Sequence, residues 1–429
     1  WKPPGNVLLI ISDDLGIDAA ACYDIGTYLA PQKNIESLCK QGIVFERAWT
    51  NPVCSPTRAT MLTGRYGFRT GIGAPSPPGI KLTETTIPKM LDKSPHLGFN
   101  HANIGKWHLS TNDNGGKNNP VMMGYNHYEG CITGVLKGYY FWDKTVASKG
   151  VDAETTQVDR YATSDVVDDA IDWLGKQKGP WFMWVAFNAP HSPFEAPPEN
   201  LHSYGDLSKI TDPYVRDVQT YRAMIEAMDR EIGRLLGSMS PEVRANTHII
   251  YVGDNGSPGS VAQPPVSPSR AKSTVYRGGI QVPMVIAGPS VRNGGRRVGA
   301  LVNSADLFAT ILELAGVDVA ATLPKGVQID SQSLVPYLSN PDQKPIREWI
   351  YADHFGPKLN AQKAAQTMRN ERYKIIHFGD GKKALFDMHD DPWEKKNLLD
   401  SGVGSLSAEA KANYDLLEKT IKELLATKK

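Results

Sequence analysis

Short apolar runs alternate with helical patterns along most of the chain, which is typical of an α/β protein. The runs contain no charged residue, as expected for strands that helices cover on both faces. The four clearest are residues 7–11, 182–187, 248–252 and 282–287. They predict buried strands of a large, mostly parallel central sheet flanked by helices.

Apolar residues spaced three and four apart predict the helices that pack on this sheet. The longest pattern covers residues 213–239, and a second covers residues 305–314, with Gly316 as its C-terminal cap. Two segments, 111–120 and 256–270, are rich in Gly, Asn, Pro and Ser and lack periodicity, so we expect loops that shape a binding site.

The pattern changes beyond about residue 345. Short strands are predicted at 349–352, 373–377 and 384–387, and a final helix begins at about residue 408. We therefore predict two parts: an α/β domain over residues 1–345 and a smaller α+β subdomain over residues 346–429, with a small sheet and a terminal helix.

Composition and charge narrow the range of partners. The 429 residues are 41% hydrophobic, as in folded proteins, and 47 Lys and Arg balance 46 Asp and Glu. No overall field therefore attracts nucleic acid or anionic lipid. The longest apolar stretch, 181–187, is too short to cross a bilayer. We expect a small-molecule partner, no nucleic acid and no membrane span.

Candidate chemistry follows four of the predicted strands. Open α/β sheets bind ligands beyond the carboxyl ends of their strands, so these side chains should converge. A short strand at about 101–104 is included because polar residues follow it directly. The candidates are Asp13 and Asp14, Lys106 and His108, His191, and Asp254 and Asn255.

The two acidic pairs predict a metal site. Asp13, Asp14, Asp254 and Asn255 offer hard oxygen ligands, which suit Ca²⁺ or Mg²⁺. The alternative is that they cap helices and form turns, as Asp and Asn do in many proteins. Two such pairs after separate strands favour the metal.

Cys54 is the third candidate feature. The four cysteines form at most one or two disulfides, and their spacing matches no zinc site. With Ser55 as N-cap and Pro56 as the first helical residue, Cys54 would lie just before a helix N-terminus, where amides favour an anion. Arg58, four residues on, would face the same anion. The alternative is a buried small hydrophobic residue or a redox-active thiol.

The segment Cys54-Ser55-Pro56-Thr57-Arg58, followed by Leu62-Thr63-Gly64-Arg65, resembles the signature of the type I, formylglycine-dependent sulfatases of the alkaline phosphatase superfamily, such as the arylsulfatases. Position 57 is Thr where Ser is common, and His101 stands where a hydroxyl residue is more usual. Neither difference removes a chemical group. Other segments resemble the family in the same chain order: 6–14, 105–108, 189–193, 254–256, 272–283 and 385–398.

The resemblance implies an alkaline-phosphatase-like fold and the hydrolysis of sulfate monoesters, aryl or other, to alcohol and inorganic sulfate. It implies that a formylglycine-generating enzyme converts Cys54 to formylglycine, whose diol binds Ca²⁺, or alternatively Mg²⁺, and attacks sulfur. The implied roles of the remaining residues are as follows: Arg58 holds the diol, Lys106, His191 and Lys272 contact the sulfate, His191 or Lys272 protonates the alcohol, and His108 takes the proton that expels sulfate.

Two other functions stay open at this stage. One is a formylglycine-dependent phosphonate monoester hydrolase or phosphodiesterase, and the other is a non-catalytic metal-containing binding protein. The chain begins with Trp1, as a trimmed chain would, and Asn255-Gly256-Ser257 is its one Asn-x-Ser/Thr site. The family that the chain resembles is mostly exported, so we expect an exported protein, periplasmic or secreted. A glycan at Asn255 would disable the metal site, which argues against a heavily glycosylated lysosomal enzyme.

Overall fold

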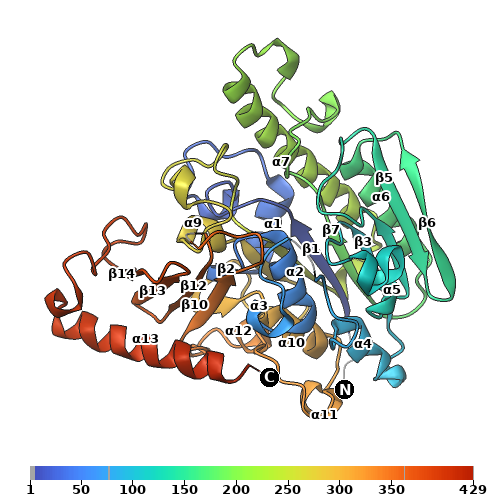
Figure 1. The fold of residues 1–429 in the computed structure, drawn as a ribbon. Helices are drawn as coiled ribbons and strands as arrows, with labels where there is room; N and C mark the ends of the chain where they lie inside the picture. The colour runs from blue at the N-terminus through green and yellow to red at the C-terminus, as the bar shows by residue number, and fades with distance from the viewer. Residues whose placement is uncertain (1–4, 76–77, 362, 429) are drawn as a thin grey trace.

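The protein is described by a computed structural model that covers residues 5–75, 78–361 and 363–428. A ten-stranded sheet forms its centre, in the order β10-β2-β9-β8-β1-β7-β3-β4-β5-β6, with helices on both faces (Figure 1). Its strands are β1 (Asn6–Ser12), β2 (Ile43–Trp49), β3 (Asn100–Gly105), β4 (His127–Gly130), β5 (Trp142–Ser148), β6 (Val151–Val158), β7 (Trp181–Ala186), β8 (Thr247–Gly253), β9 (Met284–Ala287) and β10 (Arg296–Asn303).

The sheet is mostly parallel, as predicted. Among the described strands, only β5 and β9 run against the rest. The prediction that residues 282–287 form a parallel strand is therefore wrong in direction, because β9 pairs antiparallel with both β8 and β2. The segment between β8 and β9 does not cross over to the opposite edge of the sheet. β9 therefore begins at the edge where β8 ends and runs antiparallel to it.

Alternate side chains of β1 enter two separate cores. Leu8 and Ile10 pack with residues of α1, α6 and α7, whereas Val7, Leu9 and Ile11 pack with residues of α2, α4 and α10. The helices are α1 (Lys33–Gln41), α2 (Cys54–Thr63), α3 (Gly67–Thr70), α4 (Ile87–Asp92), α5 (Asn119–Met122), α6 (Ala162–Gly175), α7 (Pro213–Gly237), α8 (Pro241–Ala245), α9 (Arg277–Ile280), α10 (Asp306–Leu314), α11 (Val319–Thr322), α12 (Val335–Ser339) and α13 (Ala408–Ala426).

The two helices predicted from periodicity are α7 and α10. Asp212 caps α7 by accepting a hydrogen bond from the Val215 amide, and a proline follows it at the first helical position. Gly316 follows the end of α10 with φ +82°, and its amide donates to Glu313 O, as a C-terminal cap requires. Of the two expected loops, 256–270 holds only a 3₁₀ turn at Pro268–Arg270, while 111–120 consists of short helical turns and the start of α5.

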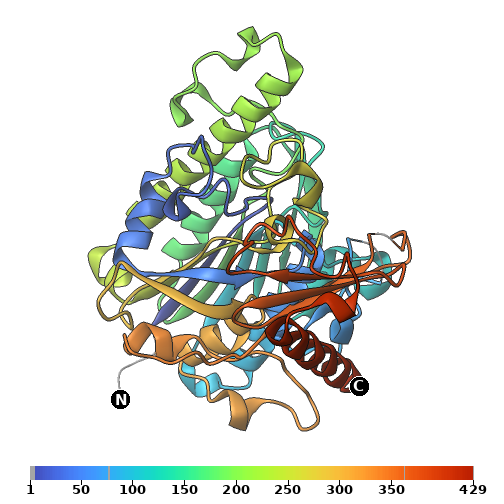
Figure 2. The same ribbon diagram turned by 90° about the vertical axis from the view of Figure 1, so that its left-hand side faces the viewer.

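A second, antiparallel sheet lies beside the first and carries α13 on one face (Figure 2). Its strands are β11 (Ile350–His354), β12 (Ala365–Arg369), β13 (Tyr373–Phe378) and β14 (Lys383–Asp387). The three predicted strands and the final helix are confirmed. β12 was not predicted, because its sequence, Ala-Gln-Thr-Met-Arg, has too few apolar residues. The domain boundary at residue 345 stays a prediction.

One disulfide, Cys22–Cys39, joins the segment after β1 to α1, and Cys54 and Cys131 are buried free thiols. Within the described part of the chain, no helix combines the length and apolarity that a membrane crossing needs.

A buried ion pair connects the small sheet to the segment before α9. The side chains of Lys374 and Glu394 are 0% and 1% exposed, and they contact each other directly. Lys374 Nζ also donates to Val275 O at 2.7 Å, and Glu394 accepts from the Arg277 amide at 2.7 Å.

We expect Lys374→Met to lower the free energy of unfolding by about 3 kcal/mol, because Glu394 would keep a buried charge without its partner. Urea denaturation measures the change. Lys411→Met, which removes one partner of an exposed ion pair with Asp415, should leave the stability nearly unchanged. A loss for Lys374→Met no larger than this control would contradict the expectation.

Candidate active site

Four parallel strands end at one edge of the large sheet, and the candidate residues follow them. Ser12 of β1 lies beside Gly253 of β8, and Ile11 and Gly105 both lie beside Ala186 of β7. Because these strands end in register, the residues that come next meet at the same edge: Asp13 after β1, Asp254 after β8 and Lys106 after β3.

Two glycines permit this close approach. Gly105 has φ +101°, and a Cβ atom there would overlap the Ala186 carbonyl. A Cβ atom on Gly256 would overlap the Gly278 carbonyl. A side chain at Gly105 would therefore push apart the ends of β3 and β7, and one at Gly256 would push the loop after β8 away from α9.

Three carboxylates and three cations form the base of the site. Arg58 donates to Asp254 Oδ2 from Nη2 at 2.9 Å and from Nε at 3.2 Å, and its Nη2 lies 3.5 Å from Asp13 Oδ2. Lys106 Nζ contacts Asp13 directly, and Lys272 Nζ lies 2.6 Å from Asp14 Oδ2. The numbers of acidic and basic groups in this cluster are equal, so the charges nearly cancel.

Arg58 contacts acidic groups of the protein. Its side chain is fully buried between the carboxylates of Asp254 and Asp13, and its Nη1 donates to Lys106 O at 2.8 Å. The expectation that it also holds the diol at residue 54 stays a prediction.

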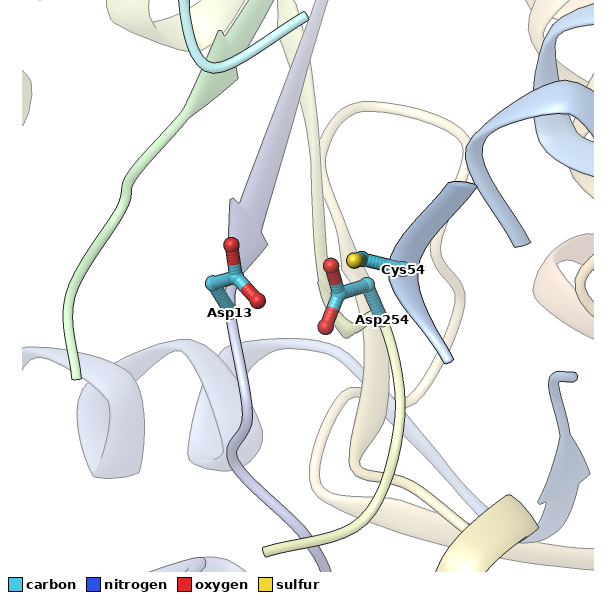
Figure 3. Close-up of side chains that lie close together, drawn as sticks. All are labelled: Asp13, Cys54 and Asp254. Carbon is cyan, nitrogen blue, oxygen red and sulfur yellow. The ribbon is translucent and has the colours of Figure 1, made fainter. Parts of the chain in front are cut away.

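Cys54 lies at the start of α2, with its sulfur beside Asp13 and Asp254 (Figure 3). The expectation that Ser55 caps this helix is wrong: the N-cap is Val53, and α2 begins at Cys54 itself. Ser55 Oγ instead donates to His108 O at 3.0 Å. Thr57 Oγ1 accepts from the Asn51 amide at 3.0 Å and so holds the turn that precedes the helix.

Two histidines border the cluster. His108 Nδ1 lies 3.1 Å from Cys54 Sγ. His191 Nε2 lies 3.7 Å from Asp14 Oδ2, while its Nδ1 lies 2.7 Å from the Ser192 carbonyl. Since a carbonyl only accepts hydrogen bonds, Nδ1 of His191 carries a proton and Nε2 is the nitrogen that faces the site. The structure thus brings all ten predicted site residues together.

Burial and neighbouring charges shift the pKa values of these groups. Burial, and next the Asp13 carboxylate, raise the pKa of Asp254 to about 7. Burial alone would also raise the pKa of Asp13, but Lys106, His191 and Arg58 hold it below its usual value. Burial, followed by Lys106 and Arg58, lowers the pKa of His108 well below the ordinary value, so this imidazole is neutral at pH 7.

The site fits a hard divalent cation. Asp13 Oδ1 and Asn255 Oδ1 are buried and have no hydrogen-bond partner among the described residues. Asn255 Nδ2 donates to Asp14 Oδ1 at 2.8 Å, which turns the amide oxygen away from Asp14 and leaves it free to bind a cation. Potential ligand atoms of Asp13, Cys54 and Asp254 lie within 4.8 Å of one another, and so do those of Asp13, Asp14 and His191.

Three residues at the site have backbones in the left-handed region: Asp14 at φ +66°, His108 at +61° and Ser273, next to Lys272, at +70°. This conformation is unfavourable for residues with a side chain, and it concentrates at functional sites. No local pattern along the chain indicates these conformations. Nor does any pattern indicate a role for Tyr221, which the helical periodicity identifies only as an apolar position; its hydroxyl donates to Asp14 O at 2.8 Å.

Comparison with known proteins gives consistent matches over nearly the whole chain. The family model described as Sulfatase matches residues 5–317, and the model described as N-sulphoglucosamine sulphohydrolase, C-terminal, matches residues 270–422. Arylsulfatase G of Rattus norvegicus is 27% identical over 89% of this chain and 77% of its own length. The ulvan-active sulfatase of Formosa agariphila is 26% identical over 92% of this chain and 77% of its own length.

A solved structure shares the fold. The crystal structure of Ps i-CgsB in complex with k-i-k-neocarrahexaose has a TM-score of 0.78 and 23% sequence identity. The match covers 99% of this chain and 94% of that one. The alkaline-phosphatase-like fold expected from the sequence is therefore confirmed.

Metal binding should weaken as the pH falls below about 7, because the proton on Asp254 must leave before the carboxylate can bind a cation. We expect the Kd for Ca²⁺ or Mg²⁺ to rise about tenfold between pH 8 and pH 6, measured by calorimetry on metal-depleted protein. Asp254→Asn is the control, since it should bind more weakly and lose most of this pH dependence. Equal wild-type affinity at both pH values would remove Asp254 from the ligand set.

Proposed function

The chain belongs to the sulfatase family and is a sulfuric ester hydrolase, and we propose that Cys54, after conversion to formylglycine, carries its reaction. The substrates would be sulfate monoesters of aryl or other alcohols, and the products the alcohol and inorganic sulfate. The observation that carries the proposal is the position of Cys54: its sulfur lies among Asp13, Asp254 and His108, at the N-terminus of a buried helix.

Asp13, Asp14, Asp254 and Asn255 would hold the cation together with the converted residue 54, and an all-oxygen set of this kind favours Ca²⁺, with Mg²⁺ as the alternative. The cation would lower the pKa of the hydroxyl that attacks sulfur and neutralise the charge that develops there. Formylglycine would supply that hydroxyl as part of a hydrated aldehyde.

The charge balance of the cluster supports an anionic substrate. Without a cation, Arg58, Lys106 and Lys272 offset the three carboxylates. A divalent cation would add two positive charges to a largely buried site, and a sulfate monoester carries the negative charge that such a site attracts. Lys106 and Lys272, freed in part from Asp13 and Asp14, would then contact the sulfate oxygens.

His108 has the position and the protonation state of a general base at residue 54. Its Nδ1 lies 3.1 Å from Cys54 Sγ, and the neutral imidazole has a lone pair to accept a proton. We assign to it the proton transfer that releases sulfate.

The side chains of His191 and Lys272 are 12% and 18% exposed, and His108 is partly exposed as well. The alcohol part of the substrate would enter past these three residues. His191 Nε2 faces the site, and with a second proton on this nitrogen the ring would protonate the departing oxygen and return to the neutral form; Lys272 is the alternative donor.

We also infer maturation and export. Conversion of Cys54 requires a formylglycine-generating enzyme as a transient partner. The disulfide between Cys22 and Cys39 supports an oxidising compartment, such as the periplasm or the extracellular space.

The mass of one peptide tests the proposal. Trypsin should release residues 48–58, and in active protein the mass of this peptide should be that of the aldehyde form of Cys54. The same preparation should hydrolyse an aryl sulfate faster than the matching aryl phosphonate monoester. Full activity with unmodified Cys54 would refute the assignment of formylglycine as the nucleophile. Faster hydrolysis of the phosphonate would instead indicate a phosphonate monoester hydrolase.

Variants of the two histidines should differ in the step that they slow. His108→Ala should release about one equivalent of phenol in a burst and then stall, because sulfate release needs its base. His191→Ala should lose about a hundredfold in kcat/KM on esters of poor leaving groups and much less on activated aryl sulfates. Rapid-quench measurement of phenol distinguishes them. A burst from the His191 variant and none from the His108 variant would reverse the two roles.

A further inference from the structure

Three buried residues behind the acidic pairs form a hydrogen-bonded bridge, which we define as Tyr221, Ser257 and Asp18. Tyr221 comes from α7, Ser257 from the loop after β8, and Asp18 from the loop after β1. The Tyr221 hydroxyl shares its one proton between Asp14 O at 2.8 Å and Ser257 Oγ at 3.2 Å, and Ser257 Oγ donates to Asp18 Oδ1 at 2.8 Å. The side chains of the bridge are almost inaccessible to water, so water does not compete for these bonds.

The bridge is attached to both acidic pairs through backbone atoms. Tyr221 OH donates to Asp14 O at 2.8 Å, and Gly16, two residues further on, donates its amide to Ser257 Oγ at 3.1 Å. Ser257 itself follows Asn255 by two residues. The bridge therefore connects the segment that carries Asp13 and Asp14 to the segment that carries Asp254 and Asn255.

Direct contacts between the two pairs use the oxygens that a cation would need. The Asp14 amide donates to Asp254 Oδ1 at 3.1 Å, and Asn255 Nδ2 donates to Asp14 Oδ1 at 2.8 Å. The bridge uses no side-chain oxygen of either pair, so it can persist unchanged when those oxygens turn to a cation. It also holds the carbonyl of Asp14, the residue with the unfavourable φ of +66°.

We propose that this bridge is a positioning device for the metal site: it holds Asp14 in its left-handed conformation and, together with the pairing of β1 and β8, sets the separation of the two acidic pairs. Tyr221, Ser257 and Asp18 are then positioning residues that act through the ligands. The inference rests on the proposed function, which assigns both pairs to a divalent cation. Outer groups that orient metal ligands typically contribute 10- to 100-fold to metal affinity.

Tyr221→Phe tests the bridge, with Tyr23→Phe as a matched control. Tyr23 lies in the same hydrophobic core, and its hydroxyl also donates to a backbone carbonyl, Phe45 O at 2.7 Å. Calorimetry with Ca²⁺ alone and with Mg²⁺ alone on metal-depleted protein gives the Kd, and urea unfolding of the same samples gives stability. We expect both variants to lose stability, Tyr23→Phe more than Tyr221→Phe because its hydroxyl also accepts from the Met284 amide at 2.9 Å. Only Tyr221→Phe should raise the Kd, by about tenfold.

A double-mutant cycle distinguishes a single shared bridge from two independent losses of packing around the metal site. Ser257→Ala should raise the Kd as Tyr221→Phe does, and the double variant should bind about as weakly as the weaker single variant, because either change breaks the same bridge. Three results would overturn the positioning role of the bridge but not the metal assignment. They are an unchanged Kd for Tyr221→Phe, an equal rise in Kd for Tyr23→Phe, and fully multiplicative effects in the double variant. Wild-type protein that binds neither ion stoichiometrically would overturn the metal assignment and the bridge with it.

Discussion

Three carboxylates buried at one edge of a sheet require compensating charge, and much of this fold provides it. Asp13, Asp14 and Asp254 are at most 1% exposed. Each uncompensated charge at such depth would cost several kcal/mol. The compensating cations come from α2, from the end of β3 and from the loop before α9, so segments far apart in the sequence must meet before the cluster is stable.

The same requirement explains the irregular backbone around the site. The segments that carry charged groups must approach β7 and α9 closely, which needs Gly105 and Gly256, and nearby residues take up left-handed conformations. Packing elsewhere in the fold offsets the energetic cost of these backbone conformations. The two apolar cores on either face of β1 hold the strands in place, so Asp14 and His108 keep their left-handed conformations.

Much of this arrangement could be predicted from the sequence, because strand runs and the polar residues after them are local patterns. The direction of β9 could not, since an apolar run is the same in either direction. The start of α2 shows a second limit. Ser and Pro are common at helix starts, yet α2 begins two residues earlier than predicted. Contacts of Ser55 with His108 and of Thr57 with Asn51 hold this earlier start. Such contacts join segments whose proximity no local pattern reveals.

The burial of Asn255 has a consequence for producing this protein in other hosts. Its side chain is fully inaccessible to water and its amide donates to Asp14. Enzymes of a eukaryotic secretory pathway attach glycans to Asn-x-Ser/Thr sites on chains that have not finished folding. A glycan on Asn255 could not enter this buried position, so a modified chain would be unable to close the loop after β8. Passage through such a pathway would thus reduce the yield of folded protein, and replacing Ser257 to remove the glycosylation site would break the bridge behind the acidic pairs.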